Sequence, residues 1–231
     1  MKNVPDTAVK GGIFHIFIPG LFLFINLVAD VYFFPGTNEG IRKFVDAIIE
    51  KPTIYLAVTI GFGYLVGVIL RMFRCGGPDY VHGKLLGMFN KFSDQRFPYV
   101  AWIGEAIKDL PEDVQNYYKE VWAGKNSLPF FNFCKMIIIS RDEKASNEIV
   151  AAESICRYSS SMFYALLVAS GFIIILLVAE WLTGHQISAA FAGLLVGYIF
   201  AIFCILINYR DIRRKEVFIV FAAAYKNRVL Y

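Results

Sequence analysis

The sequence predicts an all-α membrane protein with four transmembrane helices, both termini in the cytosol, and helical cytosolic parts. Three observations support this prediction: the 231 residues are 57% hydrophobic, only 18% are charged, and four long apolar stretches occur. A helix needs roughly 20 apolar residues to cross a hydrocarbon core of about 30 Å. A disordered chain would need low hydrophobicity and high net charge. The composition therefore excludes that class.

The first predicted span runs from Gly12 to Phe34 and the second from Thr53 to Met72. A polar start, KNVPDTAVKGG, precedes the first span, and no small-residue cleavage site follows it. These features indicate a retained helix and not a signal peptide. We therefore assign residues 1–72 to transmembrane helices 1 and 2.

Residues 73–161 are expected to form a helical cytosolic insertion with eleven basic and eleven acidic side chains. This balance argues against a nucleic-acid surface, which would show a basic excess. Two short helices are expected around Pro111, because proline suits a first helical turn. The later stretch NSLPFFNFCKMIII begins with a potential cap at Ser127 and ends in an apolar run too short to cross a bilayer.

The third predicted span runs from Met162 to Leu182 and the fourth from Ile187 to Tyr209, within residues 162–209. A long helix starting near Ser146 is expected to become the third span. The fourth span should continue into a cytosolic C-terminal helix over residues 210–231, which has helical composition and lacks proline and glycine.

Orientation follows from lysine and arginine close to the span ends. Residues 210–231 hold six basic and two acidic side chains, whereas the loop from Pro35 to Pro52 holds three of each. The C-terminal end is therefore expected in the cytosol. Four of the cations are expected either at lipid headgroups or as orientation signals: Arg210, Arg213, Arg214 and Lys215. Aromatic belts are expected from Tyr32 and Trp181 on the outer side and from Tyr158 and Tyr209 on the inner side.

Polar residues recur on one face of the first span. This face consists of His15, Pro19, Phe22, Asn26 and Asp30. One interpretation is a pore or ligand cavity, because polar groups in membrane helices usually face the bundle interior or water. The alternative is that Asn26 and Asp30 bond to neighbouring helices or lie near headgroups, while Pro19 only kinks the span.

Glu180 lies at a depth similar to that of Asp30, at the outer end of the third span. In a homo-oligomer the two could form acidic rings at a cation-selective mouth. The alternative for Glu180 is an interfacial carboxylate in water.

Small-xxx-small spacing occurs twice, at Gly63 and Gly67 and at Gly193 and Gly197. Small residues let membrane helices approach closely. The spacing is compatible with packing inside one chain and with packing between chains.

An enzyme is not expected, and no catalytic residue, metal site or cofactor is predicted. The sequence has no HExxH, Cys-x-x-Cys, GxSxG or Walker motif, which are signatures of metal, redox, hydrolase and nucleotide chemistry. The histidines and cysteines are also dispersed along the chain.

We expect an oligomeric membrane sensor or scaffold that docks a soluble cytosolic partner. This expectation rests on an aromatic-rich insertion without catalytic residues, since aromatic side chains favour interfaces. The alternative is a channel or pore-forming effector using His15, Asn26, Asp30 and Glu180. A small transporter or lipid-modifying enzyme is the third and weakest hypothesis. Most secondary transporters show inverted repeats, which four spans around one insertion do not suggest.

The layout resembles the small four-span membrane components of bacterial anti-phage defence systems. The segment FIPGLFLF in the first span, the helical insertion, and the final span running into RRKEVFIVFAAAY support the resemblance. It implies a membrane sensor or effector that works with a soluble partner encoded nearby, and it transfers no catalytic residue. The expected location is the bacterial inner membrane, and the expected partners are membrane lipids, further copies of the chain and a soluble protein, without direct nucleic-acid binding.

Overall fold

The structure is a computed structural model, and it describes the following residues: 6–34, 36–72, 78, 81, 108, 111–113, 115–116, 127–184 and 188–227. Across these residues the chain is helical and has no β-strand, which confirms the all-α prediction. The helices expected around Pro111 lie largely outside the described residues.

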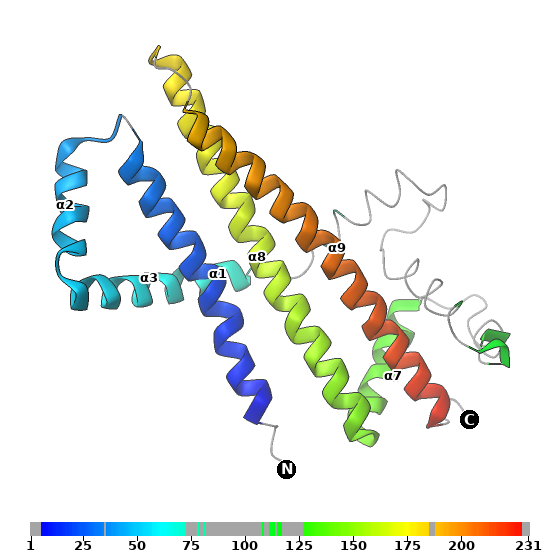
Figure 1. Cartoon of the computed structure of the whole chain (residues 1–231). Helices are drawn as coiled ribbons and strands as arrows, with labels where there is room; N and C mark the ends of the chain where they lie inside the picture. The colour runs from blue at the N-terminus through cyan, green and yellow to red at the C-terminus, as the bar shows by residue number, and fades with distance from the viewer. Residues whose placement is uncertain are drawn as a thin grey trace. The chain divides into compact units, whose positions relative to one another are not determined.

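Six α-helices make up the described chain (Figure 1). Their bounds are α1 Asp6–Phe33, α2 Glu39–Ile49, α3 Pro52–Met72, α7 Ser127–Arg141, α8 Glu143–Leu182 and α9 Ala189–Lys226. Four of them, α1, α3, α8 and α9, are long and apolar enough to cross a membrane. The helices therefore indicate a multi-pass membrane protein, as the sequence predicts.

The helices α8 and α9 have 40 and 38 residues, well beyond the roughly 20 needed for one crossing. This confirms that one helix begins before the third span and another extends beyond the fourth. The helix α8 starts at Glu143, slightly earlier than predicted, because Asp142 caps it. The Ala145 backbone N–H donates to Asp142 Oδ1 at 3.0 Å, as an N-cap side chain requires.

The short turn after α8 uses a backbone conformation that favours glycine. Gly184 has a φ of 73°, in the left-handed region where a side chain is strained. Its N–H donates to the Trp181 carbonyl at 3.2 Å. The chain then enters α9 after Ser188.

The helix α2 is a difference from the sequence analysis, which treated residues 35–52 only as a loop. Asn38 caps α2, since its side chain accepts the Gly40 N–H at 2.7 Å. Glu39 lies in the first turn, where a negative charge favours the helix dipole.

The chain divides into two compact units, which we call unit 1 and unit 2. Unit 1 comprises Met1–Ala8, Cys75–Cys156 and Ile207–Tyr231, and unit 2 comprises Val9–Arg74 and Arg157–Leu206. Unit 1 thus combines most of the predicted insertion with the predicted C-terminal helix. The helices α8 and α9 contribute residues to both units.

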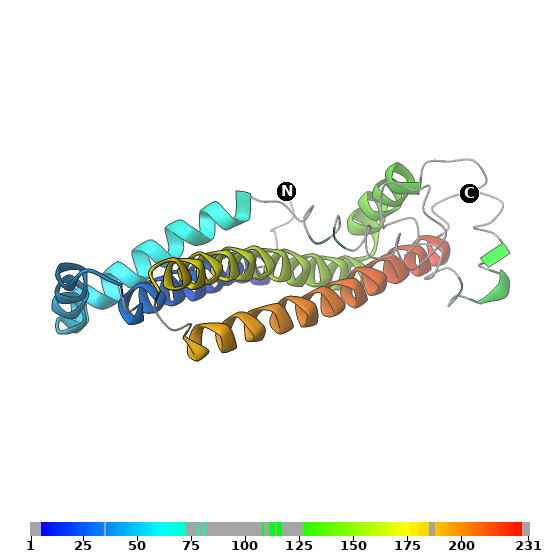
Figure 2. The same cartoon turned by 90° about the horizontal axis from the view of Figure 1, so that it is seen from above.

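Each unit has its own apolar core. In unit 1, α7 packs on α8 and α9 through Phe131, Cys134, Ile138, Ala145, Ile149, Val217, Val220, Phe221, Ala223 and Ala224. Both views show α7 beside the C-terminal end of α9 (Figures 1 and 2). In unit 2, the core joins α1, α3, α8 and α9 through Leu23, Leu70, Ala165, Leu166, Ala169, Ile173, Leu176, Phe191 and Tyr198.

Candidate functional site

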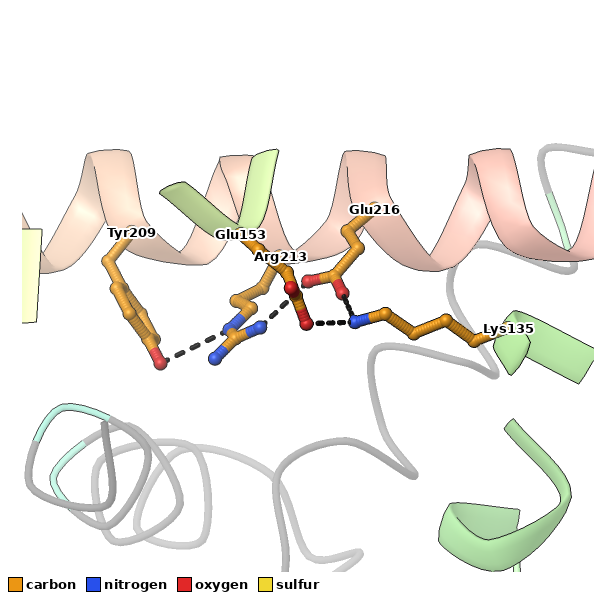
Figure 3. A network of polar contacts seen from close by, with 5 residues as sticks. All are labelled: Lys135, Glu153, Tyr209, Arg213 and Glu216. Carbon is orange, nitrogen blue, oxygen red and sulfur yellow. Dashed lines mark hydrogen bonds and ion pairs between the residues drawn. The ribbon is translucent and has the colours of Figure 1, made fainter. Parts of the chain in front are cut away.

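Four charged side chains and one tyrosine join the three helices of unit 1 (Figure 3). Its members are Lys135 on α7, Glu153 on α8, and Tyr209, Arg213 and Glu216 on α9. Lys135 Nζ contacts both Glu153 Oε1 and Glu216 Oε1. Arg213 donates from Nη1 to Glu216 Oε2 at 2.7 Å and from Nε to the Tyr209 hydroxyl at 3.1 Å. We call these five residues the charge network.

Helical spacing places the three α9 members on one face. Tyr209 precedes Arg213 by four residues and Glu216 follows it by three, and residues at these spacings are neighbours on a helix surface. The guanidinium carbon lies 5.3 Å from the centre of the Tyr209 ring, a cation–π distance. On α7, Lys135 lies four residues after the buried Phe131 and three before the buried Ile138, spacings that place it next to the inward face of the helix.

Burial makes the pairing in the charge network necessary. The Glu216 side chain has 0% exposure, and a buried charge without a partner strongly destabilises a fold. Each Glu216 oxygen contacts a different cation, Lys135 or Arg213. Together with Glu153, the network holds two positive and two negative groups. It therefore holds α7 to α8 and α9 without adding net charge.

The helix α7 also presents apolar side chains away from this core. Phe133, Met136 and Ile139 are 53%, 72% and 41% exposed, and their three-residue spacing places them on one side of the helix. We call them the α7 stripe. On the opposite side, burial raises the pKa of the Cys134 thiol to about 11, so the thiol stays neutral and unreactive.

In unit 2, the predicted polar face of α1 includes a hydrogen bond to another helix. The Tyr198 hydroxyl on α9 donates to Asn26 Oδ1 at 2.7 Å. The Asn26 amide donates to the Phe22 carbonyl at 2.7 Å. Asn26 thus corresponds to the predicted alternative in which it bonds to a neighbouring helix.

Asp30 follows Asn26 by one helical turn and is buried. Its Oδ2 has no hydrogen-bond partner. An ionisable group in this situation within a membrane helix is a functional candidate by default. His15 lies elsewhere on α1, with its ring centre 5.8 Å from that of Tyr158 on α8.

Glu180 differs from the expectation of an interfacial carboxylate in water, because its side chain is fully buried. Its Oε2 accepts the Ser188 N–H at 2.9 Å. Ser188 directly precedes α9, where a negative charge interacts favourably with the helix dipole. One oxygen of Glu180 thus stabilises the connection between α8 and α9, while Oε1 has no partner.

The two glycine pairs have different surroundings. A Cβ atom on Gly67 would lie 2.0 Å from the Ile16 carbonyl oxygen, and one on Gly20 would lie 2.0 Å from that of Gly63. The first pair therefore lets the backbones of α1 and α3 touch inside one chain. A Cβ atom on Gly193 or Gly197 would meet nothing within 4 Å.

The four cations after the fourth span also differ in how exposed their side chains are. Arg213 is buried in the charge network. This burial does not fit the headgroup contact, and its alternative role as an orientation signal stays a prediction. Arg210 and Lys215 are exposed and Arg214 is half-buried. Their expected contact with headgroups stays a prediction.

The sequence analysis missed the charge network. A signal was present, since Lys135 is a single charge within the apolar run FFNFCKMIII and Glu216 precedes the apolar run VFIVF. Charges in such positions are buried by the faces around them and require partners. Tyr209, expected in an aromatic belt, is fully buried beside them.

Among the side chains that the structure describes, no group of three or more histidine, cysteine, aspartate or glutamate residues could hold a metal ion. No known protein family, curated protein or solved structure matches the chain. The residues of the two units are therefore the basis for any functional conclusion.

Proposed function

We propose that the protein is a non-enzymatic, oligomeric membrane sensor or scaffold that docks a soluble partner through unit 1. The partner would bind on the cytosolic side, with both termini of the chain in the cytosol. The α7 stripe is the single observation that supports this proposal most directly.

The α7 stripe has the chemistry of an interface. Aromatic residues and methionine are enriched at protein interfaces, and Phe133 and Met136 are the two most exposed members of the stripe. The charge network holds α7 through Lys135, which lies one turn before Ile139 at the edge of the stripe. The ion pairs thus fix the orientation of α7 before a partner binds. A preorganised surface loses less conformational entropy on binding.

A conformational change in unit 1 could be transmitted to the membrane through α8 and α9. Glu153 and Glu216, which pair with Lys135, belong to helices that also contain candidate spans. A partner that shifts α7 would perturb those two pairs. Sensing would then be a shift between two arrangements of α7, favoured by the partner's differential affinity.

The test is purification of the native complex in mild detergent. The wild-type chain should retain a soluble protein at fixed stoichiometry. The double substitution Phe133→Ser with Met136→Ser should remove that protein without changing the oligomeric mass of the chain. Mass determination and quantification of each species give both results.

A matched control is Phe218→Ser, which alters another exposed apolar side chain of unit 1. This variant should retain the partner. A solitary oligomer from native membranes, or equal loss of the partner in both variants, would contradict docking at the α7 stripe.

A role in bacterial anti-phage defence is the context that the layout of the chain suggests, with the inner membrane as its location. Expression together with its neighbouring genes should then protect a sensitive bacterium from phage. The Phe133→Ser, Met136→Ser variant should lose this protection. Equal phage titres with and without the wild-type chain would contradict the defence role.

A channel is the second candidate, and the unpartnered Oδ2 of Asp30 favours it. Carboxylates along a cation pathway select by charge. In this case Asp30→Asn should change the ion selectivity of reconstituted wild-type protein. If neither protein conducts in planar bilayers, the candidate is rejected.

A further inference from the structure

The connector helix α2 has two chemically different sides. Apolar residues lie at positions 41, 44, 45 and 48, a spacing that places them on one side of a helix. Charged residues at positions 39, 42, 43 and 46 lie on the other side. We call Ile41, Phe44, Val45 and Ile48 the α2 stripe.

The α2 stripe is only partly covered within the described chain, where Val45 and Ile48 are half-buried. No residue of α2 is buried, and Phe44 and Ile41 are 66% and 47% exposed. An amphipathic helix normally buries its apolar side against a core. The exposed part of this side, at Ile41 and Phe44, is therefore open to contact from outside the chain.

The charged side of α2 is attached to the end of α1. The Tyr32 hydroxyl donates to Asp46 Oδ1 at 2.9 Å. Arg42 Nη2 donates to the Phe34 carbonyl at 2.8 Å. These bonds restrict rotation of α2 about its axis and leave the α2 stripe away from the polar contacts.

The candidate spans of α1 and α3 lie close to α2 along the chain. The candidate span in α1 ends at Phe33 and that in α3 begins at Pro52. Three residue steps join Ile49 to Pro52, and an extended chain covers at most about 3.5 Å per step. The end of α2 therefore lies within about 10 Å of the start of a span.

Exposed apolar side chains of the candidate spans also lie close to α2 along the chain. Phe33 at the end of α1 is exposed, as are Ile54 and Leu56 at the start of α3. On candidate spans these exposed apolar side chains meet the bilayer. The two candidate spans thus place exposed apolar side chains directly before and directly after α2 along the chain.

We propose that α2 is an interfacial helix whose apolar stripe inserts into the bilayer surface. Amphipathic helices of this kind bury one side at the boundary between headgroups and acyl chains. The proposal is independent of partner docking by unit 1. It concerns a lipid surface, and a second copy or another protein on the α2 stripe is an alternative outcome of the test.

The charges of α2 define the lipid class. The segment from Pro35 to Pro52 holds three basic and three acidic side chains, so it has no net attraction to anionic headgroups. Basic interfacial segments gain about 1 kcal/mol per cation from such lipids. The insertion of α2 should instead be the same in neutral and anionic membranes.

The test uses spin labels on the full-length chain in vesicles. Single cysteines at Phe44 or Lys43, in a variant whose native cysteines are replaced by alanine, place labels on opposite sides of α2. Collision with oxygen, which concentrates in lipid, should exceed collision with a water-soluble nickel chelate several-fold more at Phe44→Cys than at Lys43→Cys. The ratio should not change when phosphatidylglycerol is added to phosphatidylcholine vesicles.

Three results would contradict the proposal. Equal access of the nickel chelate at both positions would place the α2 stripe in water. An immobile label at Phe44→Cys that neither reagent reaches would place protein on the stripe. A ratio that rises with phosphatidylglycerol would reject the neutral-lipid prediction.

A second measurement covers the case in which the cysteine-free chain does not fold. Phe44→Trp and Lys43→Trp in the otherwise native chain are compared in vesicles of brominated phosphatidylcholine. Quenching should be stronger for Phe44→Trp, because bromine atoms lie on the acyl chains. Equal quenching in the two variants would overturn the proposal.

Discussion

The two units treat buried polar groups in opposite ways. In unit 1, both oxygens of Glu216 contact cations, and the charges of the network balance. In unit 2, Asp30 and Glu180 are buried as well, yet each leaves one oxygen without a hydrogen-bond partner. Unit 1 thus pairs both oxygens of its buried glutamate with cations, while unit 2 leaves one buried oxygen of each acidic residue without a partner.

The difference indicates what holds each unit together. In lipid, the hydrophobic effect contributes little to helix association, and small residues and hydrogen bonds take its place. Gly20, Gly63 and Gly67 and the bond between Asn26 and Tyr198 are contacts of this type. Unit 1 instead combines an apolar core with a directional charge network. Substitutions should therefore affect the two units through different contacts.

The largest effect is expected from Glu216→Leu in unit 1. This change leaves Lys135 and Arg213 with Glu153 as the remaining acidic member of the network. Breaking a buried ion pair in this way costs about 3–5 kcal/mol. The measurements are the thermal midpoint in detergent and the maleimide labelling rate of Cys134, which should rise as α7 loosens.

Two controls distinguish pairing from general damage. Lys215→Met removes an exposed neighbouring charge and should leave both readouts unchanged. Adding Lys135→Met to Glu216→Leu restores the charge balance, so the double variant should be less destabilised than the two single effects predict together. Strict additivity would contradict a coupled network.

The next effect concerns close packing in unit 2. Gly67→Ala forces a methyl group against the Ile16 backbone and should cost about 1–3 kcal/mol or more, as overpacking does. Gly197→Ala enters open space and should be neutral or slightly stabilising, because alanine favours helices. Thermal midpoints of the two variants test this ranking, and the reverse order would contradict the packing of α1 on α3.

A smaller effect is expected from the hydrogen bond between spans. Tyr198→Phe removes the donor to Asn26 Oδ1 and should cost about 0.6 kcal/mol, the average for such bonds in membranes. Tyr64→Phe, at an exposed position of α3, is the matched control. Equal midpoints for both variants would show that the bond adds no stability.

The smallest effect is a pH dependence at the start of α8. The Ala145 N–H and then the Asn227 side chain hold the pKa of Asp142 below its usual value. The stabilisation is therefore complete above the unfolded pKa and is lost as pH falls through the lower folded pKa. Asp142→Asn should flatten this part of the acid stability profile, and an unchanged profile would contradict the assignment.

The amino-acid sequence by itself determined the helical class and the candidate spans. Span length and apolar composition are local properties, because a helix satisfies its own backbone in lipid. The extension of α9 beyond the fourth span followed from its composition. The helix α2 was treated as part of a loop, although the Asn38 cap and the apolar spacing that begins at Ile41 are local signals that indicate it.

Tertiary structure alone decided the partners of individual side chains. Arg213 looked like a headgroup cation, but α7 and α8 meet α9 there and the residue pairs with Glu216. Glu180 looked like an exposed carboxylate, but it is buried and accepts the Ser188 N–H. The two glycine pairs have the same spacing but different surroundings. Gly63 and Gly67 face α1, whereas a Cβ atom on Gly193 or Gly197 would meet nothing within 4 Å. A side chain's neighbours come from distant segments, so local patterns do not determine them.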